Sequence, residues 1–273
     1  MKVTVIFTCF NRKEKSLKCM QTLAGQDSGI EYGFIVVDDN STDGTAESIK
    51  ALDYHVELLH GSGSLYWAGG MRKGIEAYLE SSFDSEYVLL VNDDVEFYEG
   101  IVDKMITESK EKKDAVIVGA TCDDSGAFSY GAMQLIVPRK KDLYRQVSPA
   151  EGKVECDTFN CNCVLLNDAV IRKAGNFDPI YTHSLADIDY GLRLRKLGFH
   201  IYSSERYVGV CNKNSIRGTW ADNSLSRKER LKKKESPKGA PCREWFHFMK
   251  KNFGFMEAVK YSVSPYVRIM LGM

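Results

Sequence analysis

The sequence predicts an α/β fold in which a mainly parallel sheet is flanked by helices. Short apolar runs rich in β-branched residues alternate with segments of helical periodicity, at the interval typical of right-handed βαβ units. With 273 residues, the chain is long enough for one large α/β domain or two small ones. Its composition, 44% hydrophobic and 27% charged residues, is ordinary for a soluble globular protein.

Strands and helices alternate regularly as far as residue 120. Residues 2–8 are β-branched and apolar and predict the first strand, and Leu17, Met20 and Leu23 give residues 13–24 a helical spacing. The later strands and helices of this half are expected at residues 34–37, 45–52, 56–59, 71–79, 87–91, 100–108 and 115–120.

The pattern changes after Thr121, where long polar connections predict a mixed second half. The elements expected there are strands at 130–137, 158–166 and 200–203 and helices at 168–174 and 187–197. Residues 212–242 are polar and rich in Gly, Ser and Lys, which predicts a mobile loop. The tail that follows interleaves aromatic residues with Lys and Arg.

Basic charge is concentrated near the C-terminus, although the net charge of the chain is zero. Residues 225–251 contain ten Lys or Arg against three Glu, a net charge of +7, so the rest of the chain carries −7. This distribution argues against a dedicated nucleic-acid binder and for one specific anionic contact. Residues 227–238 could close as a lid over a diphosphate, or residues 243–266 could rest on an anionic membrane surface. A solvated loop and a packed tail are the third interpretation.

The sequence shows no signal for export or membrane insertion. The first seven residues run straight into a strand pattern, without a long apolar region or a cleavage site. No window reaches the length of a transmembrane helix. The eight cysteines have no compact spacing, and Cys161 and Cys163 are too close for a two-residue zinc knuckle. We therefore expect a cytoplasmic protein with reduced, structural cysteines.

Polar side chains follow the buried strand at residues 87–91. Asn92, Asp93 and Asp94 come directly after it, at the edge of the sheet where ligands bind in open α/β folds. Hard oxygen ligands at one point suit Mg²⁺ or Mn²⁺, and such an ion could hold a diphosphate. The alternative is a polar turn after a core strand.

A second acidic pair, Asp38 and Asp39, follows the strand at residues 34–37. Adjacent carboxylates repel each other, so the pair is costly unless something binds it. A carboxylate can accept from the imide N–H of a pyrimidine base or from a ribose hydroxyl. Helix capping is the alternative, and it fits the neighbouring residues 41–43 better than the pair itself.

The glycine-rich residues 61–70 allow close backbone approach to a ligand, on which Tyr66 or Trp67 could stack. The segment is not a dinucleotide fingerprint, because Tyr66 stands where the third glycine would be and the segment does not follow the first strand. A dehydrogenase is therefore disfavoured.

Asp187 and Asp189 stand at the start of a predicted helix. Two residues apart, they point in different directions and cannot both face one ligand. Either acid could act as a general base, or both could simply stabilise the helix N-terminus. His183, four residues earlier, could bind metal or phosphate, or be structural.

Taken together, these features resemble the inverting family-2 glycosyltransferases with a GT-A fold, whose sheet is Rossmann-like. The resemblance covers most of residues 1–203. It is carried by residues 5–12, 36–45, 91–94, 162–165, 175–178 and 187–193. Residues 63–70 and 187–190 look most like rhamnosyltransferase-type members that build bacterial surface polysaccharides.

The resemblance implies a role for each matching residue. The family's Asp-x-Asp metal motif reads Asn92-Asp93-Asp94, so Asp94 would bind Mg²⁺ or Mn²⁺, and Asn92 makes the metal weak or optional. His183 is the second candidate metal ligand, from its position near Asp187 alone. The family's Glu-Asp pair reads Ala186-Asp187, so Asp187 would be the catalytic base. The residues expected to bind the donor are Thr8, Phe10, Asn11, Asp38, Asp39, Gly63, Trp67, Gly70, Arg72, Asn92 and Asp93.

The function that the resemblance implies is inverting transfer of a sugar from a UDP- or dTDP-linked donor, with rhamnose as a candidate, to a hydroxyl of a growing lipid-linked glycan. Residues 1–120 would bind the nucleotide sugar, residues 121–211 the acceptor, and residues 212–273 would form a mobile basic loop and a helical tail. Contact with the inner face of the plasma membrane would involve residues 225–268. The alternatives are a noncatalytic sugar- or nucleotide-binding protein and a nucleotidyltransferase.

Overall fold

The computed structural model describes residues 1–25, 29–81, 84–136 and 142–273. The first half alternates strands and helices as the sequence predicts. Its elements are β1 (Lys2–Cys9), α1 (Lys13–Ala24), β2 (Glu31–Asp38), α2 (Thr45–Lys50), β3 (His55–His60), α3 (Tyr66–Glu80), β4 (Tyr87–Val91), β5 (Glu96–Phe97), α4 (Ile101–Glu111) and β6 (Val116–Cys122).

The second half is mixed, with short strands before its helices. Its elements are β7 (Phe128–Tyr130), β8 (Ala132–Leu135), β9 (Tyr144–Gln146), β10 (Glu155–Cys156), β11 (Thr158–Phe159), β12 (Cys163–Asn167), α5 (Asp168–Ala174), α6 (Ala186–Lys196) and β13 (Ile201–Val210). The strand expected at residues 130–137 is divided at Gly131, where the chain leaves β6 and enters a second sheet, β11-β8-β9. Val137 lies outside the described residues.

The main sheet combines strands from both halves of the chain. Its order is β10-β13-β6-β12-β4-β1-β2-β3, with β5 and β7 attached to β13 and β6. Strands β1 to β4 run parallel to one another, whereas β12 runs antiparallel between β4 and β6. The predicted fold, a mainly parallel sheet with a mixed second half, is confirmed.

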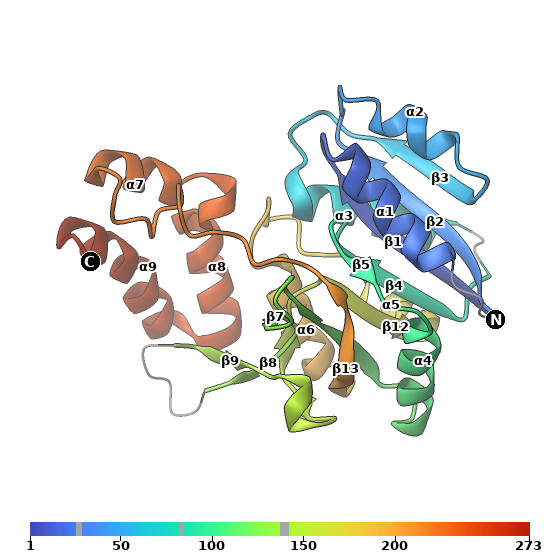
Figure 1. Ribbon diagram of the computed structural model, residues 1–273. Coiled ribbons are helices and arrows are strands. Elements are labelled where there is room, and N and C mark those ends of the chain that lie inside the picture. The colour runs from blue at the N-terminus through green and yellow to red at the C-terminus, as the bar shows by residue number, and fades with distance from the viewer. Residues whose placement is uncertain (26–28, 82–83, 137–141) are drawn as a thin grey trace.

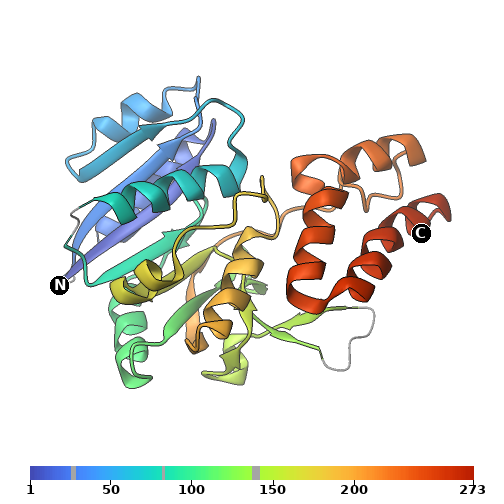
Figure 2. The ribbon, with the colours of Figure 1, turned by 180° about the vertical axis from the view of Figure 1, so that it is seen from behind.

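Helices cover both faces of this sheet. Because side chains alternate along a strand, β1 sends Ile6 to one face and Val5 and Phe7 to the other. Helices α1, α2 and α4 pack on the second face, and α3, α5 and α6 on the first (Figures 1 and 2). Cys9 pairs with Asp38 and Asp38 with His60, so the carboxyl ends of β1, β2 and β3 share one edge.

The C-terminal residues form a helical unit beside the sheet (Figures 1 and 2). It contains α7 (Arg227–Lys234), α8 (Cys242–Phe253) and α9 (Phe255–Met270). The sequence predicts a loop where α7 lies, but the Ser226 hydroxyl and the Glu229 carboxylate form a capping box that begins this helix. Arg230 is buried and donates to the carbonyls of Trp220 and Met273, which fixes α7 against its surroundings.

All eight cysteines are free thiols, and seven of them are buried. Burial raises the pKa of Cys9, Cys19 and Cys163, so these thiols stay protonated at neutral pH. Across the ranges 1–25, 29–81, 84–136 and 142–273, no helix is both long and apolar enough to cross a membrane.

Candidate active site

Two adjoining cavities lie at the carboxyl edge of the sheet. The larger, about 410 Å³, contains Asp187, and the smaller, about 300 Å³, contains Asp39. In α/β folds this edge is where ligands bind, because loops from several strand ends converge there. Both cavities are lined by the same five side chains, which form their common wall: Arg12, Trp67, Asp93, His183 and Lys238.

The smaller cavity has the features of a nucleoside site. Thr8 and Phe10, at the end of β1, line it together with Gly63. The Phe10 side chain is 50% exposed, so its ring is available for stacking on a base.

The Asp39 carboxylate is 4% exposed and is largely occupied by the protein backbone. Its oxygens accept N–H bonds from Gly63 at 2.8 Å, Leu65 at 2.9 Å and Tyr66 at 3.2 Å. The observed role of Asp39 is therefore to hold the glycine-rich loop against the end of β2. A ligand in this cavity meets the loop that Asp39 positions.

Asp38 and Asn11, both expected to bind the donor, lie outside the lining of the two cavities. The Asp38 carboxylate is buried and accepts from the backbone N–H of Ser41. The Asn11 side-chain oxygen accepts from the backbone N–H of Thr42 at 2.8 Å. These two side chains shape the loops after β1 and β2, because both satisfy backbone donors that strand pairing leaves open.

Gly70 and Arg72, also expected at the donor, lie outside the cavities as well. Gly70 is buried against Thr8: a Cβ at position 70 would lie 2.6 Å from the Thr8 Cβ. Gly70 is therefore needed for close packing of α3 on β1. The Arg72 guanidinium donates to the carbonyl of Tyr181 at 3.2 Å, so it anchors the segment before α6.

The acidic residues after β4 are paired with an arginine. The Arg12 guanidinium lies 3.1 Å from Asp93 Oδ1 and 3.0 Å from Asp94 Oδ2. The Ser16 hydroxyl donates to Asp93 Oδ2 at 3.2 Å. Burial nevertheless raises the pKa of Asp93 to about 6, with a smaller contribution in the same direction from Asp94.

Asn92, which replaces the first acid of the metal motif, has a specific partner. Its side-chain oxygen accepts from Trp67 Nε1 at 2.8 Å. This bond fixes the indole in the common wall and occupies the oxygen that the motif would offer to a metal. The sequence could not indicate this pairing, because 25 residues separate the two side chains.

The residues around Asp94 fit a divalent ion only if Arg12 moves aside. Asp93 and Asp94 offer hard oxygen ligands, but both already pair with Arg12. In the described part of the chain, no three His, Cys, Asp or Glu side chains are grouped as metal ligands. His183 Nδ1 accepts from the backbone N–H of Trp67 at 3.4 Å, and burial, reinforced by Lys238 and Arg12, lowers the pKa of His183 to about 4.

The side chains of Asp187 and Asp189 point in different directions, as helix geometry requires. Asp187 lines the larger cavity, where its carboxylate accepts from the backbone N–H groups of Cys161 at 3.2 Å and Ile188 at 2.9 Å. Burial raises the pKa of Asp187, and these hydrogen bonds act in the opposite direction.

Asp189 points away from the cavity. It is 1% exposed, pairs with Lys251 Nζ at 2.7 Å and accepts from Asn252 Nδ2 at 2.9 Å, so it ties α6 to α8. Helix α6 begins after Leu185 without a side-chain cap, although both acids lie in its first turn, where the helix dipole favours negative charge.

Three residues that the predictions left out have prominent positions. Arg12 and Lys238 are the two basic residues of the common wall, and Tyr144 lines the larger cavity with Asp187. Arg12 directly follows the strand-end residues predicted to bind the nucleotide, which is a usable signal. Lys238 ends the segment 227–238, for which a lid over a diphosphate is one of the sequence interpretations, whereas nothing in the sequence pattern brings Tyr144 to this edge.

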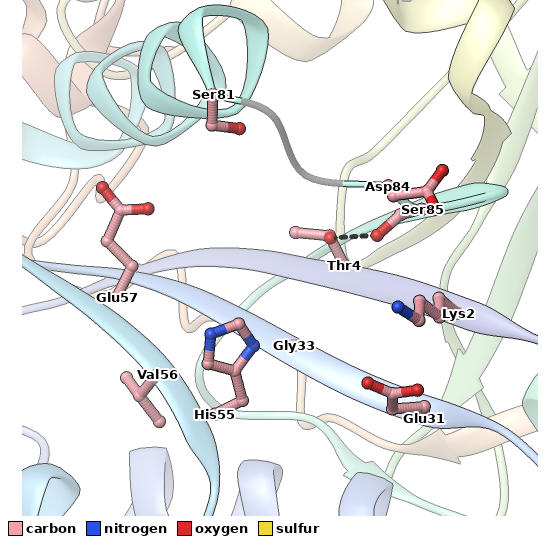
Figure 3. Close-up of a pocket in the computed structure, with 10 residues that line it drawn as sticks. All are labelled: Lys2, Thr4, Glu31, Gly33, His55, Val56, Glu57, Ser81, Asp84 and Ser85. Atoms are coloured by element: carbon pink, nitrogen blue, oxygen red, sulfur yellow. Dashed lines mark hydrogen bonds between the residues drawn. The ribbon is translucent and has the colours of Figure 1, made fainter.

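A further cavity of about 570 Å³ lies at the opposite, amino-terminal ends of β1 and β2 (Figure 3). Its side chains carry mixed charge, with Lys2 near Glu31 and a hydrogen bond of 2.6 Å between Thr4 and Ser85. The carboxyl strand ends and Asp187 are far from it along the sheet, so we place the candidate site at the paired cavities.

Comparison with known proteins identifies the class. The model of glycosyl transferase family 2 matches residues 4–172, which is more than half of the chain, and the chain belongs to this family. A Mycobacterium tuberculosis relative, "N-acetylglucosaminyl-diphospho-decaprenol L-rhamnosyltransferase", is 24% identical over 190 residues, in two strains. The match covers 60% of this chain and 61% of the relative.

Solved structures of other glycosyltransferases share the fold. The mannosyltransferase PcManGT from Pyrobaculum calidifontis, in complex with GDP-Man and Mn²⁺, has a TM-score of 0.61 at 13% identity, covering 99% of this chain and 73% of that one. S. aureus TarS with UDP-GlcNAc has a TM-score of 0.63 at 13% identity, covering 98% and 90%. The expected GT-A fold is confirmed.

Proposed function

We propose that this protein is an inverting glycosyltransferase that moves a sugar, with rhamnose as the first candidate, from a UDP- or dTDP-linked donor to a hydroxyl of a lipid-linked surface glycan. The observation that carries the proposal is the pair of joined cavities: a nucleoside-sized one holding Phe10, and a larger one with the Asp187 carboxylate on its wall. The mycobacterial relative, named for rhamnosyl transfer to a diphospho-decaprenol-linked sugar, supports the choice of sugar and acceptor.

The donor would bridge the two cavities. Its base would lie by Phe10, and its diphosphate would cross the common wall, where Arg12 and Lys238 both reach the lining. Preorganised cations next to the leaving group stabilise the negative charge that grows on it in the transition state. We therefore assign Arg12 and Lys238 to the diphosphate.

A divalent ion at Asp94, Mg²⁺ or Mn²⁺, remains part of the proposal as a weak or optional cofactor. When bound, it would neutralise charge on the diphosphate. It has to compete with the Arg12 guanidinium for Asp93 and Asp94, which is the physical reason for weak binding.

Asp187 would act as the general base in the larger cavity. It accepts the proton of the acceptor hydroxyl while the oxygen forms a bond to the anomeric carbon and the bond to the nucleoside diphosphate breaks, with inversion. The backbone N–H groups of Cys161 and Ile188 hold the carboxylate in place. Asp189 cannot share this role because it is bound to Lys251 on α8.

We also propose peripheral contact with the inner face of the plasma membrane within residues 225–268, where a lipid-linked acceptor would be presented. Most of the tail's aromatic residues are not available for this contact, since Trp245, Phe246 and Tyr261 pack against the core, whereas Phe255 is 59% exposed. Helix α9 does expose apolar side chains, including Met256 at 79% and Val263 at 52%. Apolar exposure next to basic charge is typical of interfacial helices.

Donor turnover is the test of the proposed function. The full chain would be incubated with UDP-, dTDP- and GDP-linked sugars, with EDTA or with Mn²⁺, and the release of nucleoside diphosphate measured. We expect slow hydrolysis of one UDP- or dTDP-sugar, since transferases pass sugar to water without an acceptor. Binding of a nucleotide sugar without any turnover, alone or with acceptor glycans, would instead identify a noncatalytic binder.

A further inference from the structure

A groove beside the larger cavity combines aromatic walls with two basic residues. Its volume is about 470 Å³, and it runs between the β9 segment and the last two helices. Tyr144, Trp220 and Trp245 line both the groove and the cavity that contains Asp187. A molecule whose reacting hydroxyl lies at Asp187 can therefore continue into the groove without leaving the protein surface.

The basic residues of the groove are Lys260 and Arg268, which lie two turns apart on α9. Lys260 Nζ lies 5.2 Å from the centre of the Tyr261 ring, and Arg268 Cζ lies 6.0 Å from the centre of the Trp220 ring. Neither forms an ion pair with a carboxylate in the part of the chain that the structure describes. One acidic side chain, Asp142, also lines the groove, so the side chains of the lining together carry one net positive charge.

The face of α9 next to these cations is apolar and exposed. At 100° per residue, Val259, Val263 and Val267 fall on one stripe, which Met256 and Met270 extend. Their exposed fractions are 43%, 52%, 48%, 79% and 55%. Lys260 lies directly beside this stripe on the helix surface. A solvated helix rarely exposes such a continuous apolar face without something to cover it.

We propose that the groove binds the diphosphate of a lipid-linked acceptor, with Lys260 and Arg268 on the diphosphate and the hydrocarbon chain along the exposed apolar stripe of α9. The order of features along the surface matches such a molecule: Asp187 for the sugar hydroxyl, aromatic rings for the sugar, cations for the diphosphate and apolar side chains for the lipid. This inference rests on the proposed function, since it requires an acceptor hydroxyl at Asp187.

A second copy of the chain fits the same face less well. Residues 212–273 contain fourteen Lys or Arg against five Asp or Glu, a net charge of +9. Two such surfaces would repel each other, whereas an anionic lipid headgroup is attracted. Charge complementarity therefore selects the lipid diphosphate as the occupant.

Farnesyl diphosphate, below its micellar concentration, is the probe for this site. Binding to the full chain would be measured by tryptophan fluorescence, since Trp220 and Trp245 line the groove, with farnesol and inorganic diphosphate as separate arms. We expect farnesyl diphosphate to bind at least tenfold more tightly than either, because only it offers both the charge and the chain. The double variant Lys260→Ala/Arg268→Ala should weaken its binding at least tenfold.

The matched control is Lys228→Ala/Lys232→Ala, which removes the same charge from the exposed surface of α7. It should leave farnesyl diphosphate binding unchanged. Equal weakening by the two double variants, or no weakening by the first, would overturn the groove assignment, as would equally tight binding of inorganic diphosphate alone. The stripe would instead bind a second copy of the chain if two results were found together. The chain would dimerise in a concentration-dependent way that Val263→Asp abolishes, and it would bind farnesyl diphosphate no more tightly than farnesol or inorganic diphosphate.

Donor hydrolysis separates this result from the proposed function. Lys260 and Arg268 lie outside both cavities of the candidate active site, so their double variant should release nucleoside diphosphate at the wild-type rate. If the wild-type chain hydrolyses the donor but binds farnesyl diphosphate and farnesol equally well, only the groove assignment is wrong. If the wild-type chain shows no donor turnover at all, the result counts against the proposed function instead.

Discussion

Replacing Asp187 by Asn tests the assignment of the catalytic base, because the two aspartates of α6 offer a matched pair. The amide keeps one oxygen, which can accept from either Cys161 or Ile188 but not from both, because the carboxylate uses a different oxygen for each N–H group. The amide cannot take a proton from an acceptor. General-base catalysis is worth about 10²–10⁴-fold, so kcat should fall by that factor, which is about 3–5 kcal/mol in activation free energy.

The effect of Asp187→Asn on stability should be small. Burial raises the pKa of Asp187, which means that its charged form is disfavoured in the folded protein. A neutral amide removes that cost, but it also leaves one of the two backbone N–H groups without its acceptor. The two effects oppose each other, so the free energy of unfolding at pH 7 should change by less than about 1 kcal/mol.

Asp189→Asn is the control and should show the reverse behaviour. It removes a charge that pairs with Lys251 and accepts from Asn252 inside the protein. Hydrogen bonds to buried charged groups contribute about 1.5–3 kcal/mol each. Lys251 keeps its ion pair with Asp178 at 2.9 Å, so the unfolding free energy should fall by about 2 kcal/mol. Turnover per folded molecule should change little.

The assay combines urea unfolding with donor turnover in the presence and absence of acceptor. Nucleotide affinity is measured in parallel, and both variants should retain it, since neither residue lines the smaller cavity. Wild-type kcat in Asp187→Asn, or a hundredfold loss in a folded Asp189→Asn, would refute the reasoning and move the base to the other carboxylate.

Three further outcomes follow from the site and its packing. The pKa of Asp93 is about 6 in the folded protein, above its usual 3.8, so the stability that this residue contributes is fully present below about pH 4 and is lost as pH rises to about 6. This loss amounts to about 3 kcal/mol of unfolding free energy, and urea unfolding from pH 4 to 7 should show that it is absent in Asp93→Asn. If the unfolding free energy of the variant falls with pH as steeply as that of the wild type, Asp93 is not the cause. Arg12→Ala should weaken nucleotide binding in EDTA and strengthen Mn²⁺ binding by about tenfold, measured by calorimetry, because two carboxylates lose their cation; unchanged Mn²⁺ affinity would show that the guanidinium and the ion do not compete. Gly70→Ala should lower the unfolding free energy by about 1–3 kcal/mol, since its Cβ would overlap the Thr8 side chain, whereas Gly29→Ala, which meets nothing within 4 Å, should change it little.

The order of strands and helices was readable from the sequence because local patterns determine it. Apolar runs such as residues 87–91 must be buried, and the polar residues that follow them must lie at the sheet edge. The opposite directions of Asp187 and Asp189 followed from helix geometry alone. The prediction was wrong at residues 227–234. Their polar composition predicts a loop, but a capping box at their start and the burial of Arg230 make them helical.

Side-chain partners were decided only by the tertiary structure. Sheet order places β4 beside β1, and this neighbourhood brings Arg12 to Asp93 and Asp94 across about eighty residues. The same folding turns Arg72 toward Tyr181 and brings Lys238 into the common wall.

The sequence by itself determined the class of fold, the edge at which the site lies and the acids that stand there, because each depends on residues close together in the chain. The tertiary structure decided which partners each of those acids has and which cavity it faces. Asp39, Asp93 and Asp189 are engaged by backbone, arginine and lysine partners, while Asp187 faces the cavity. Hydrogen-bond and charge pairing between distant segments is a property of packing, and no local pattern encodes it.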